Sequence, residues 1–338
     1  RYWRDWSSDV CSSDLLGGTG ASGMNPDLRT PYSTQYNLTI EKEVKGMGLS
    51  FSYVSTLGRK GVWSRNLNQV PADTRPYTEK LAQVPFPYLF TATFQDNGGA
   101  HNYNAGVIKA ERRFKGGLYY QAHLTWAKSI ADDWTTTPED AFNRRRERSQ
   151  GGQIPKWRGV VVGIYELPFG KGRRFGSGMP SAVNHVVGGW STAGTYVYRT
   201  GMYFSPSYAG VDASNTNIRN GRPDRIADGN LSSGRTIERW FDTAAFVAPA
   251  AGIGRFGSSG AFVLQGPSMS VFHFGLNKEV PIAERFRLKL EMVSTNFFNH
   301  PVFSNPSATV ATPAFGRVLG TVGTDGNRNF QLTARLTF

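Results

Sequence analysis

The sequence predicts an all-β chain whose strands form part of an antiparallel transmembrane β-barrel. Three observations indicate this fold class: a composition rich in Gly and aromatic residues, long segments in which apolar and polar residues alternate, and connectors that are alternately short and long. The chain of 338 residues has 39 Gly, 22 Phe, 14 Tyr and 8 Trp, while 19% of its residues are charged. This composition is typical of β-structure rather than of helical bundles.

Alternation with a period of two residues is the clearest local signal, because successive side chains of a strand point to opposite faces. Between Leu118 and Trp126 every second residue is apolar or aromatic, and the intervening residues are more polar. Several such segments are long enough for a membrane-crossing strand of about 9 to 11 residues, whereas a globular strand has about 5 to 6. About nine strands are predicted, near residues 33–44, 48–58, 102–114, 117–128, 157–167, 190–204, 268–280, 285–297 and 327–338.

Connector lengths predict how these strands lie across a membrane, because outer-membrane barrels have short periplasmic turns and longer extracellular loops. The short connectors are residues 45–47, 115–116 and 281–284, and long connectors separate them. Residues 168–189 form a connector of intermediate length, which we place on the periplasmic side with the short ones. This pattern puts Phe338 in the periplasm. Because an odd number of strands does not close a bacterial barrel, the barrel is predicted to be incomplete and to need further N-terminal strands.

The first 15 residues stand apart from this pattern. They include the run Arg4-Asp5-Trp6-Ser7-Ser8-Asp9, which resembles a translated sequencing-adaptor junction and has no strand or helix periodicity. We therefore assign residues 1–15 to a sequencing-adaptor artefact, and residues 16–338 to the C-terminal part of an outer-membrane β-barrel domain. Cys11 is the sole cysteine, so the chain forms neither an internal disulfide nor a cysteine-based zinc site.

A series of short motifs runs in order from about Asn25 to the end of the chain. They include Asn25-Pro26-Asp27-Leu28, Thr125-Trp126-Ala127-Lys128-Ser129, Glu166-Leu167-Pro168-Phe169-Gly170-Lys171-Gly172, Trp240-Phe241-Asp242-Thr243-Ala244-Ala245-Phe246 and Phe297-Phe298-Asn299-His300-Pro301. Together these motifs resemble the barrel of Oar-like TonB-dependent receptors.

The resemblance implies a barrel of about 22 strands around a plug domain, with this chain supplying the C-terminal strands. Members of that family move large solutes across the outer membrane, driven by the inner-membrane TonB complex. An N-terminal carboxypeptidase regulatory-like domain often precedes the plug, and contact with the TonB complex is expected through that missing N-terminal region. The terminal Phe338 resembles the aromatic signal that outer-membrane barrels present to the barrel assembly machinery.

The aromatic residues fall into two groups. Those near strand ends are predicted to lie at the two membrane interfaces, because their rings have an apolar body and a polar edge. Those in the long connectors are candidates for stacking on a ligand or for packing within the loops. The first group is Trp126, Trp157, Tyr165, Trp190, Phe297 and Phe298, and the second is Tyr77, Phe86, Tyr88, Phe90 and Trp134.

No motif predicts catalysis, a cofactor or a metal. Residues 252–257 match the spacing of a dinucleotide-binding glycine motif, but no helical pattern follows them, as that motif requires. The five histidines are dispersed without the close spacing of metal ligands. The chain is therefore predicted not to be an enzyme.

Three functions remain open. The first is an outer-membrane TonB-dependent receptor or transporter that moves a large solute, and the second is a surface adhesion or polymer-binding barrel without active transport. The third, raised by the formal charge of +13, is a soluble basic β protein that binds nucleic acid or anionic glycan. The basic runs 144–148 and 171–174 lie in connectors, where charge runs are usually solvated, and outer-membrane lipid and lipopolysaccharide are equally natural partners. Nucleic acid is therefore not expected as a partner.

Overall fold

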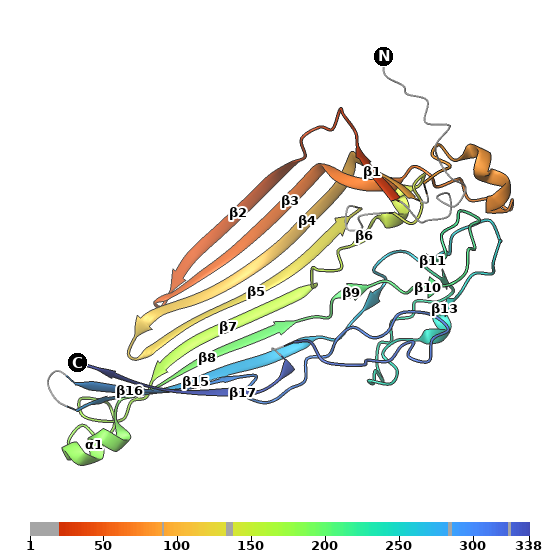
Figure 1. The fold of residues 1–338 in the computed structure, drawn as a ribbon. Helices are drawn as coiled ribbons and strands as arrows, with labels where there is room; N and C mark the ends of the chain where they lie inside the picture. The colour runs from red at the N-terminus through yellow and green to blue at the C-terminus, as the bar shows by residue number, and fades with distance from the viewer. Residues whose placement is uncertain (1–19, 90, 133–137, 283–285, 324–325) are drawn as a thin grey trace.

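The nine predicted strands are all present in a computed structural model of the chain, which describes residues 20–89, 91–132, 138–282, 286–323 and 326–338. Each long strand pairs antiparallel with the next long strand along the chain, so they form one sheet (Figure 1). In chain order they are β2 (Tyr32–Val44), β3 (Met47–Asn66), β4 (Thr91–Lys115), β5 (Leu118–Ala131), β7 (Trp157–Glu166), β8 (Trp190–Arg199), β15 (Met269–Pro281), β16 (Arg287–Thr295) and β17 (Asn329–Thr337). The predicted all-β antiparallel fold is confirmed.

The two ends of this sheet differ in their connectors. One end carries the short turns, the segment with helix α1 (Ser181–Val187) and the C terminus (Figure 1). The other end carries the four long connectors, at 67–90, 132–156, 200–268 and 296–328. The sequence predicts an outer-membrane barrel, in which short turns are periplasmic and long connectors are extracellular, and we name the two ends accordingly.

Two of the short turns show why their residues suit a tight hairpin. A two-residue turn that matches the twist of its strands needs positive φ at both central residues. Lys45 and Gly46 have φ of 51° and 78°, and Gly116 and Gly117 have φ of 64° and 81°. Because glycine adopts positive φ without steric cost, three of these four positions are unstrained.

The register of the strands divides the sheet into two chemically different faces. Ile108 lies opposite Leu124 on one face, and Lys109 lies opposite His123 on the other. We call the first the apolar face; it also includes Tyr36, Leu38, Ile40, Phe51, Tyr53, Trp126, Val161, Tyr196, Phe272, Leu290 and Leu332. We call the second the polar face; it also includes Glu41, Glu43, Glu111, Gln121, Arg158, Arg199, Asn277, Lys289, Glu291 and Arg335.

Lipid accounts for the exposure of the apolar face. Phe51, Ile108 and Leu124, which lie on the inner strands β3, β4 and β5, are 51%, 54% and 40% exposed. An apolar surface that continues across all nine long strands is unfavourable in water. In a barrel wall this surface contacts hydrocarbon, and the polar face lines the lumen. No helix in the described part of the chain is long and apolar enough to cross a membrane.

Three predicted boundaries are wrong. The connector expected from about residue 58 to 101 is shorter, because β3 continues to Asn66 and β4 begins at Thr91. These extensions lie beyond the apolar stretch, where neither face has to contact hydrocarbon and apolar alternation is not needed. Strand β8 ends at Arg199 rather than near residue 204, and the next pair of extended residues, β9 (Tyr203–Phe204), leaves the sheet to pair with β14 (Leu264–Gln265).

Two short strands join the sheet that the sequence did not predict. Strand β1 (Gly20–Met24) pairs parallel with β4, and β6 (Ser149–Gln150) pairs with the end of β5. The long path itself ends at β2 on one side and β17 on the other, and these two strands do not pair, so the barrel is not closed. An open sheet edge in hydrocarbon leaves backbone groups without hydrogen bonds, so further strands are needed to complete the wall.

The two faces are expected to respond differently to an introduced positive charge. Leu124→Arg, in the middle of β5 on the apolar face, is expected to lower the free energy of unfolding by about 2 to 4 kcal/mol, because the guanidinium enters hydrocarbon. Gln121→Arg, on the polar face of the same strand opposite Glu111, is expected to change it by less than about 1 kcal/mol. Urea unfolding of the complete barrel in lipid bilayers measures both values. Equal losses would contradict the assignment of the faces.

Candidate functional site

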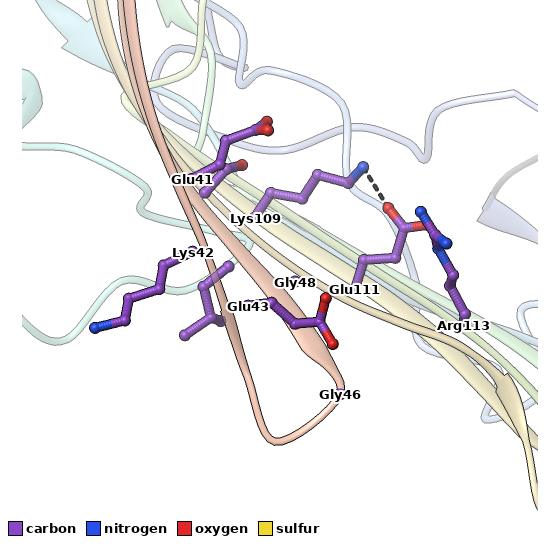
Figure 2. A pocket seen from close by; sticks show the side chains of 10 residues that line it. Glu41, Lys42, Glu43, Gly46, Gly48, Lys109, Glu111 and Arg113 are labelled. Carbon is purple, nitrogen blue, oxygen red and sulfur yellow. Dashed lines mark ion pairs between the residues drawn. The ribbon is translucent and has the colours of Figure 1, made fainter.

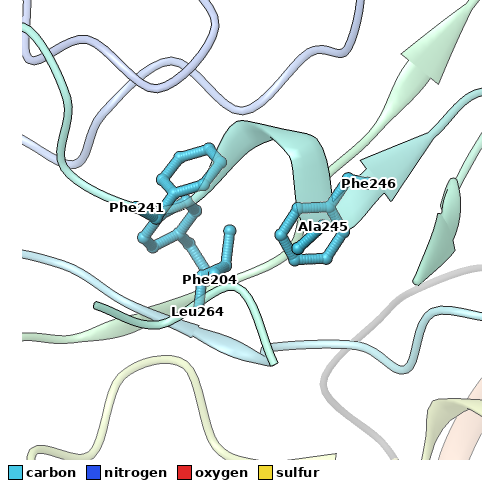
Figure 3. Close-up of a cluster of buried hydrophobic side chains, with 5 residues drawn as sticks. All are labelled: Phe204, Phe241, Ala245, Phe246 and Leu264. Atoms are coloured by element: carbon cyan, nitrogen blue, oxygen red, sulfur yellow. The ribbon is translucent and has the colours of Figure 1, made fainter. Parts of the chain in front are cut away.

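The long connectors fold together at the extracellular end. We call residues 67–89, 138–156, 200–268 and 296–323 the loop assembly. Its apolar centre is a cluster of buried side chains in which Phe241 contacts Phe204 and Phe246, with ring centroids 6.0 Å away in each case (Figure 3). The partly buried Phe315 packs against this cluster, with its ring centroid 5.1 Å from that of Phe241. Leu264, fully buried, completes the cluster with Ala245. Burial of several aromatic rings gives these connectors a core of their own.

Hydrogen bonds join the connectors to one another. Gln69 Nε2 donates to the Glu139 carbonyl oxygen at 2.8 Å, which links the first connector to the second. Asn215 Nδ2 donates to the carbonyl oxygen of Asp73 at 2.9 Å, which links the third to the first. The backbone N–H of Ser207 donates to the carbonyl of residue 308 at 2.9 Å, which links the third to the fourth. The four connectors therefore form one packed unit.

A buried ion network lies between the second and third connectors. Arg222 places Nη1 2.7 Å from Glu147 Oε2 and Nη2 2.8 Å from Glu139 Oε2. Arg146 contacts the same Glu139 carboxylate at 2.8 Å. Burial opposes the charge of Arg222, but the hydrogen bonds that it donates to Glu147 and the charges of both glutamates outweigh this effect and raise the Arg222 pKa. Sequence reasoning missed this network, because 75 residues separate Glu147 from Arg222 and no local pattern pairs them.

The loop assembly covers the polar face of the sheet and leaves the apolar face open. On β5, Ala127, Ser129 and Ala131 alternate with Trp126 and Lys128. The first three, on the polar face, are 4%, 2% and 0% exposed, whereas Trp126 is 50% exposed. The N–H of residue 151 donates to the Ser129 carbonyl at 2.9 Å, so the second connector lies directly against this strand. The connectors therefore fold inward, over what becomes the lumen of a complete barrel.

A cleft of about 720 Å³ opens where three connectors meet. Its wall carries Asp224 and Arg255, whose carboxylate and guanidinium approach to 2.6 Å. This contact lowers the pKa of Asp224, with further help from the Ser258 backbone N–H. Phe256 and Ile226 supply an apolar wall. A cleft with one ion pair and apolar walls suits a solute with both polar and apolar groups.

Charged side chains line the polar face near the periplasmic ends of β2, β3 and β4 (Figure 2). Lys109 Nζ lies 2.5 Å from Glu111 Oε2, and Glu41 and Arg113 border the same hollow of about 410 Å³. Lys42, which follows Glu41 in β2, points to the opposite side of the hairpin (Figure 2). This end of the inner wall is therefore strongly polar.

The predicted interface aromatics all lie on the apolar face. Trp126 and Trp157 are opposite each other on β5 and β7, with ring centroids 6.3 Å apart. Tyr165 stands at the periplasmic end of β7; at about 3.3 Å per residue and a tilt of about 40°, this is about 20 Å across the membrane from Trp157. That height is close to the apolar band of about 25 Å expected for a barrel. Trp190 begins β8 at the periplasmic end. Phe297 and Phe298 follow β16 at the other end, where Phe298 stacks on Phe272 and Phe297 contacts Phe274 at a tilt.

The predicted loop aromatics are not gathered in one place. Tyr77 begins the short helix η2 (Tyr77–Gln83) and is half-buried, while Phe86 and Tyr88 are 45% and 67% exposed. These three are not among the residues that line the cleft. Phe90 and Trp134 lie outside the described residues. Contact of these aromatics with a ligand stays a prediction.

The remaining candidate features are simpler. Phe338, directly after β17, is 90% exposed, and its role as an assembly signal stays a prediction. In the residues that the structure describes, no group of three His, Cys, Asp or Glu side chains could hold a metal ion. Residues 252–257 lie in a loop of the third connector, and the segment that follows them is not the helix that the dinucleotide-binding motif requires.

A family model described as an outer membrane beta barrel domain matches residues 8–331. The chain belongs to this family. It is therefore an outer-membrane protein, and the third function considered above, a soluble basic β protein, is excluded. None of the curated proteins matches the chain significantly.

The chain is similar to several solved structures of outer-membrane transporters, at low sequence identity. The copper transporter OprC has 9% identity and a TM-score of 0.40, over 93% of this chain and 32% of that one. The outer membrane transporter YddB from Escherichia coli has 8% identity and a TM-score of 0.45, over 95% and 34%. The FrpB iron transporter from Neisseria meningitidis has 11% identity and a TM-score of 0.44, over 93% and 32%. The chain spans about a third of the length of these structures.

The buried ion network predicts that the loop assembly depends on Arg222. Arg222→Met leaves the Glu147 carboxylate buried without its guanidinium and is expected to destabilise the assembly by about 3 to 5 kcal/mol. The matched control is Arg239→Met, which removes an exposed ion pair with Asp242 and is expected to cost less than about 1 kcal/mol. Hydrogen exchange of residues 138–156 and 200–268 measures both. Unchanged protection in the Arg222 variant would show that the network does not hold the connectors together.

Alkaline pH is expected to loosen the loop assembly through Tyr208. Burial, followed by the charges of Glu139 and Asp212, raises the pKa of Tyr208 to about 12, whereas an unfolded tyrosine ionises near pH 10. Because the folded pKa is the higher one, the stabilisation is complete below about pH 10 and is lost as pH rises towards about 12. Tyr208→Phe has no such group, so its loops should resist proteolysis to higher pH than those of the wild type. Identical pH profiles for the two proteins would refute this cause.

Proposed function

We propose that this chain supplies part of the wall and the extracellular gate of an outer-membrane transporter of the TonB-dependent type, which moves a large solute across the membrane. The observation that carries the proposal is the one-sided burial on β5. Ala127, Ser129 and Ala131 are covered by the loop assembly, whereas Trp126 on the opposite side of the strand is open. Loops that fold over the lumen side restrict entry, and a transporter needs such a gate more than an adhesion surface does.

The inner wall supports the same function. Its side chains alternate in sign, with Lys109 beside Glu111 and Lys289 beside Glu291, at 2.5 and 2.6 Å. A lumen lined by paired charges stays hydrated and offers polar contacts to a passing solute or to a domain inside the barrel. The assignment to the TonB-dependent type itself rests on the series of motifs from Asn25 onward.

The cleft of the loop assembly is the proposed first contact for the solute. Its Asp224–Arg255 pair offers both an acceptor and a donor, and Phe256 and Ile226 offer apolar area. The solute class therefore combines hydrogen-bonding groups with apolar surface. We propose that other parts of the protein contact the partners on the periplasmic side, including the TonB complex.

Uptake by whole cells tests this function. Cells that produce the complete protein are expected to accumulate one member of a panel of large labelled solutes in the periplasm, and collapse of the proton gradient should abolish the accumulation. The double variant Asp224→Asn/Arg255→Gln should raise the half-saturating concentration about tenfold, because it removes one charge-assisted pair that contacts the solute. The control Glu238→Gln/Arg317→Gln removes an exposed pair away from the cleft and should leave uptake unchanged. Binding to the cell surface without gradient-dependent entry would favour an adhesion barrel instead.

A further inference from the structure

A bulge in β3 places two neighbouring cations on the same side of the sheet. Regular alternation would send Arg59 and Lys60 to opposite faces. The register of β3 against β4 shifts between Gly58 and Gly61, and Lys60 has a φ of 54°, which is uncommon for a residue with a side chain. As a result Lys60 Nζ lies 5.5 Å from the centre of the Tyr32 ring, which is opposite Arg59 in the ladder.

A third cation, Arg29, is held beside the same bulge by hydrogen bonds through Asn97. Asn97 Nδ2 donates at 2.8 Å to the carbonyl oxygens of both Arg29 and Lys60, and the N–H of Arg29 donates back to Asn97 Oδ1. The side chains of Arg29, Arg59 and Lys60 all border one cleft of about 630 Å³. Asn97 therefore holds a segment before β2 against the bulge, so that three cations meet at one cleft.

These three cations lack a carboxylate partner among the described residues. Arg59 Nη1 donates only to neutral acceptors, at 2.7 Å to the Gly58 carbonyl, 3.3 Å to the His101 carbonyl and 2.8 Å to Asn102 Oδ1. Two acidic residues, Asp27 and Asp96, also border the cleft, and Arg65 lies 3.7 Å from Asp96. The fourth cation there, Arg144, is paired with Asp132 at 3.2 Å. The cleft therefore has a surplus of positive charge.

The position of the cleft relative to the membrane indicates which anion can reach it. On β3, Phe51, Tyr53 and Leu57 lead up the apolar face to Arg59, and on β2 the same face ends at Tyr32. The three cations thus stand where the lipid-facing surface meets water at the extracellular end. In an outer membrane, the phosphates of the outer-leaflet glycolipid lie at this level, next to the hydrocarbon.

We propose that Arg29, Arg59 and Lys60 form a binding site for the phosphate groups of the outer-leaflet glycolipid, lipopolysaccharide. Their guanidinium and ammonium groups donate charge-assisted hydrogen bonds to phosphate oxygens, while Tyr32 and Leu57 contact the acyl chains below. The strained bulge serves this site, because it turns Lys60 from the lumen side to the lipid side. The site is separate from the solute cleft and depends only on the outer-membrane location of the chain.

Binding of purified lipopolysaccharide to the complete protein in mild detergent tests the site. Arg59→Gln/Lys60→Gln is expected to weaken binding about tenfold or more, because it removes two charge-assisted contacts. Arg59→Lys keeps the charge and should retain most of the affinity. The matched control is Lys42→Gln/Lys45→Gln, which removes two cations at the periplasmic end of the same hairpin and should bind as the wild type does.

Two further arms identify the source of the phosphate. Lipopolysaccharide stripped of its phosphates is expected to bind the wild type as weakly as intact lipopolysaccharide binds the double variant. Inorganic phosphate is expected not to displace intact lipopolysaccharide at equal concentration. Undiminished binding of the stripped lipid, displacement by inorganic phosphate, or equal binding by wild type and double variant would each overturn the proposal. If the double variant does not assemble, as judged by heat-modifiable migration in gels, the exposed single variant Lys60→Gln is measured by the same criteria.

Discussion

Backbone hydrogen bonding in hydrocarbon is the constraint on which the rest of this structure depends. A strand that crosses lipid must pair its N–H and C=O groups with neighbouring strands, since water does not reach them. The unbroken antiparallel ladder from β2 to β17 meets this requirement, and the tight turns at the periplasmic end fix its register. Once the register is fixed, lipid selects every second side chain to be apolar. The other half is free to be charged, as Lys109 and Glu111 are.

The sequence predicts those parts of the fold in which one face of a strand contacts lipid. Between Leu118 and Trp126 the apolar alternation is clear because one face of β5 meets hydrocarbon, and all nine long strands were found for this reason. Beyond the membrane neither face contacts hydrocarbon, so residues 59–66 of β3 carry no such alternation and the sequence predicts a loop there. The parallel strand β1 has the sequence Gly-Ala-Ser-Gly-Met, which contains no alternation and gives no signal of its partner.

The candidate site could be predicted only in part. The motif from Trp240 to Phe246 was visible in the sequence, but its role, with Phe241 at the centre of the buried cluster, follows only from three-dimensional contacts. The basic run at 144–148 was interpreted as solvated, yet Arg146 pairs with Glu139 and Arg144 with Asp132. A charge run is solvated unless distant residues bring carboxylates to it. Those carboxylates reach it through tertiary packing, which periodicity does not encode.

The chain thus folds in two environments, lipid for the sheet and water for the loop assembly, and the two parts meet on strand β5. The wall places its apolar side chains outward to lipid, whereas the loop assembly places Phe204, Phe241 and Leu264 inward, as a water-soluble domain does. At the contact, the polar face of β5 carries the small side chains of Ala127, Ser129 and Ala131, all of which are buried. Small residues let the loop assembly approach the wall closely, while the large Trp126 lies on the other side of the same strand. Small side chains on one face and an apolar aromatic on the other allow a single strand to contact both the loop assembly and lipid.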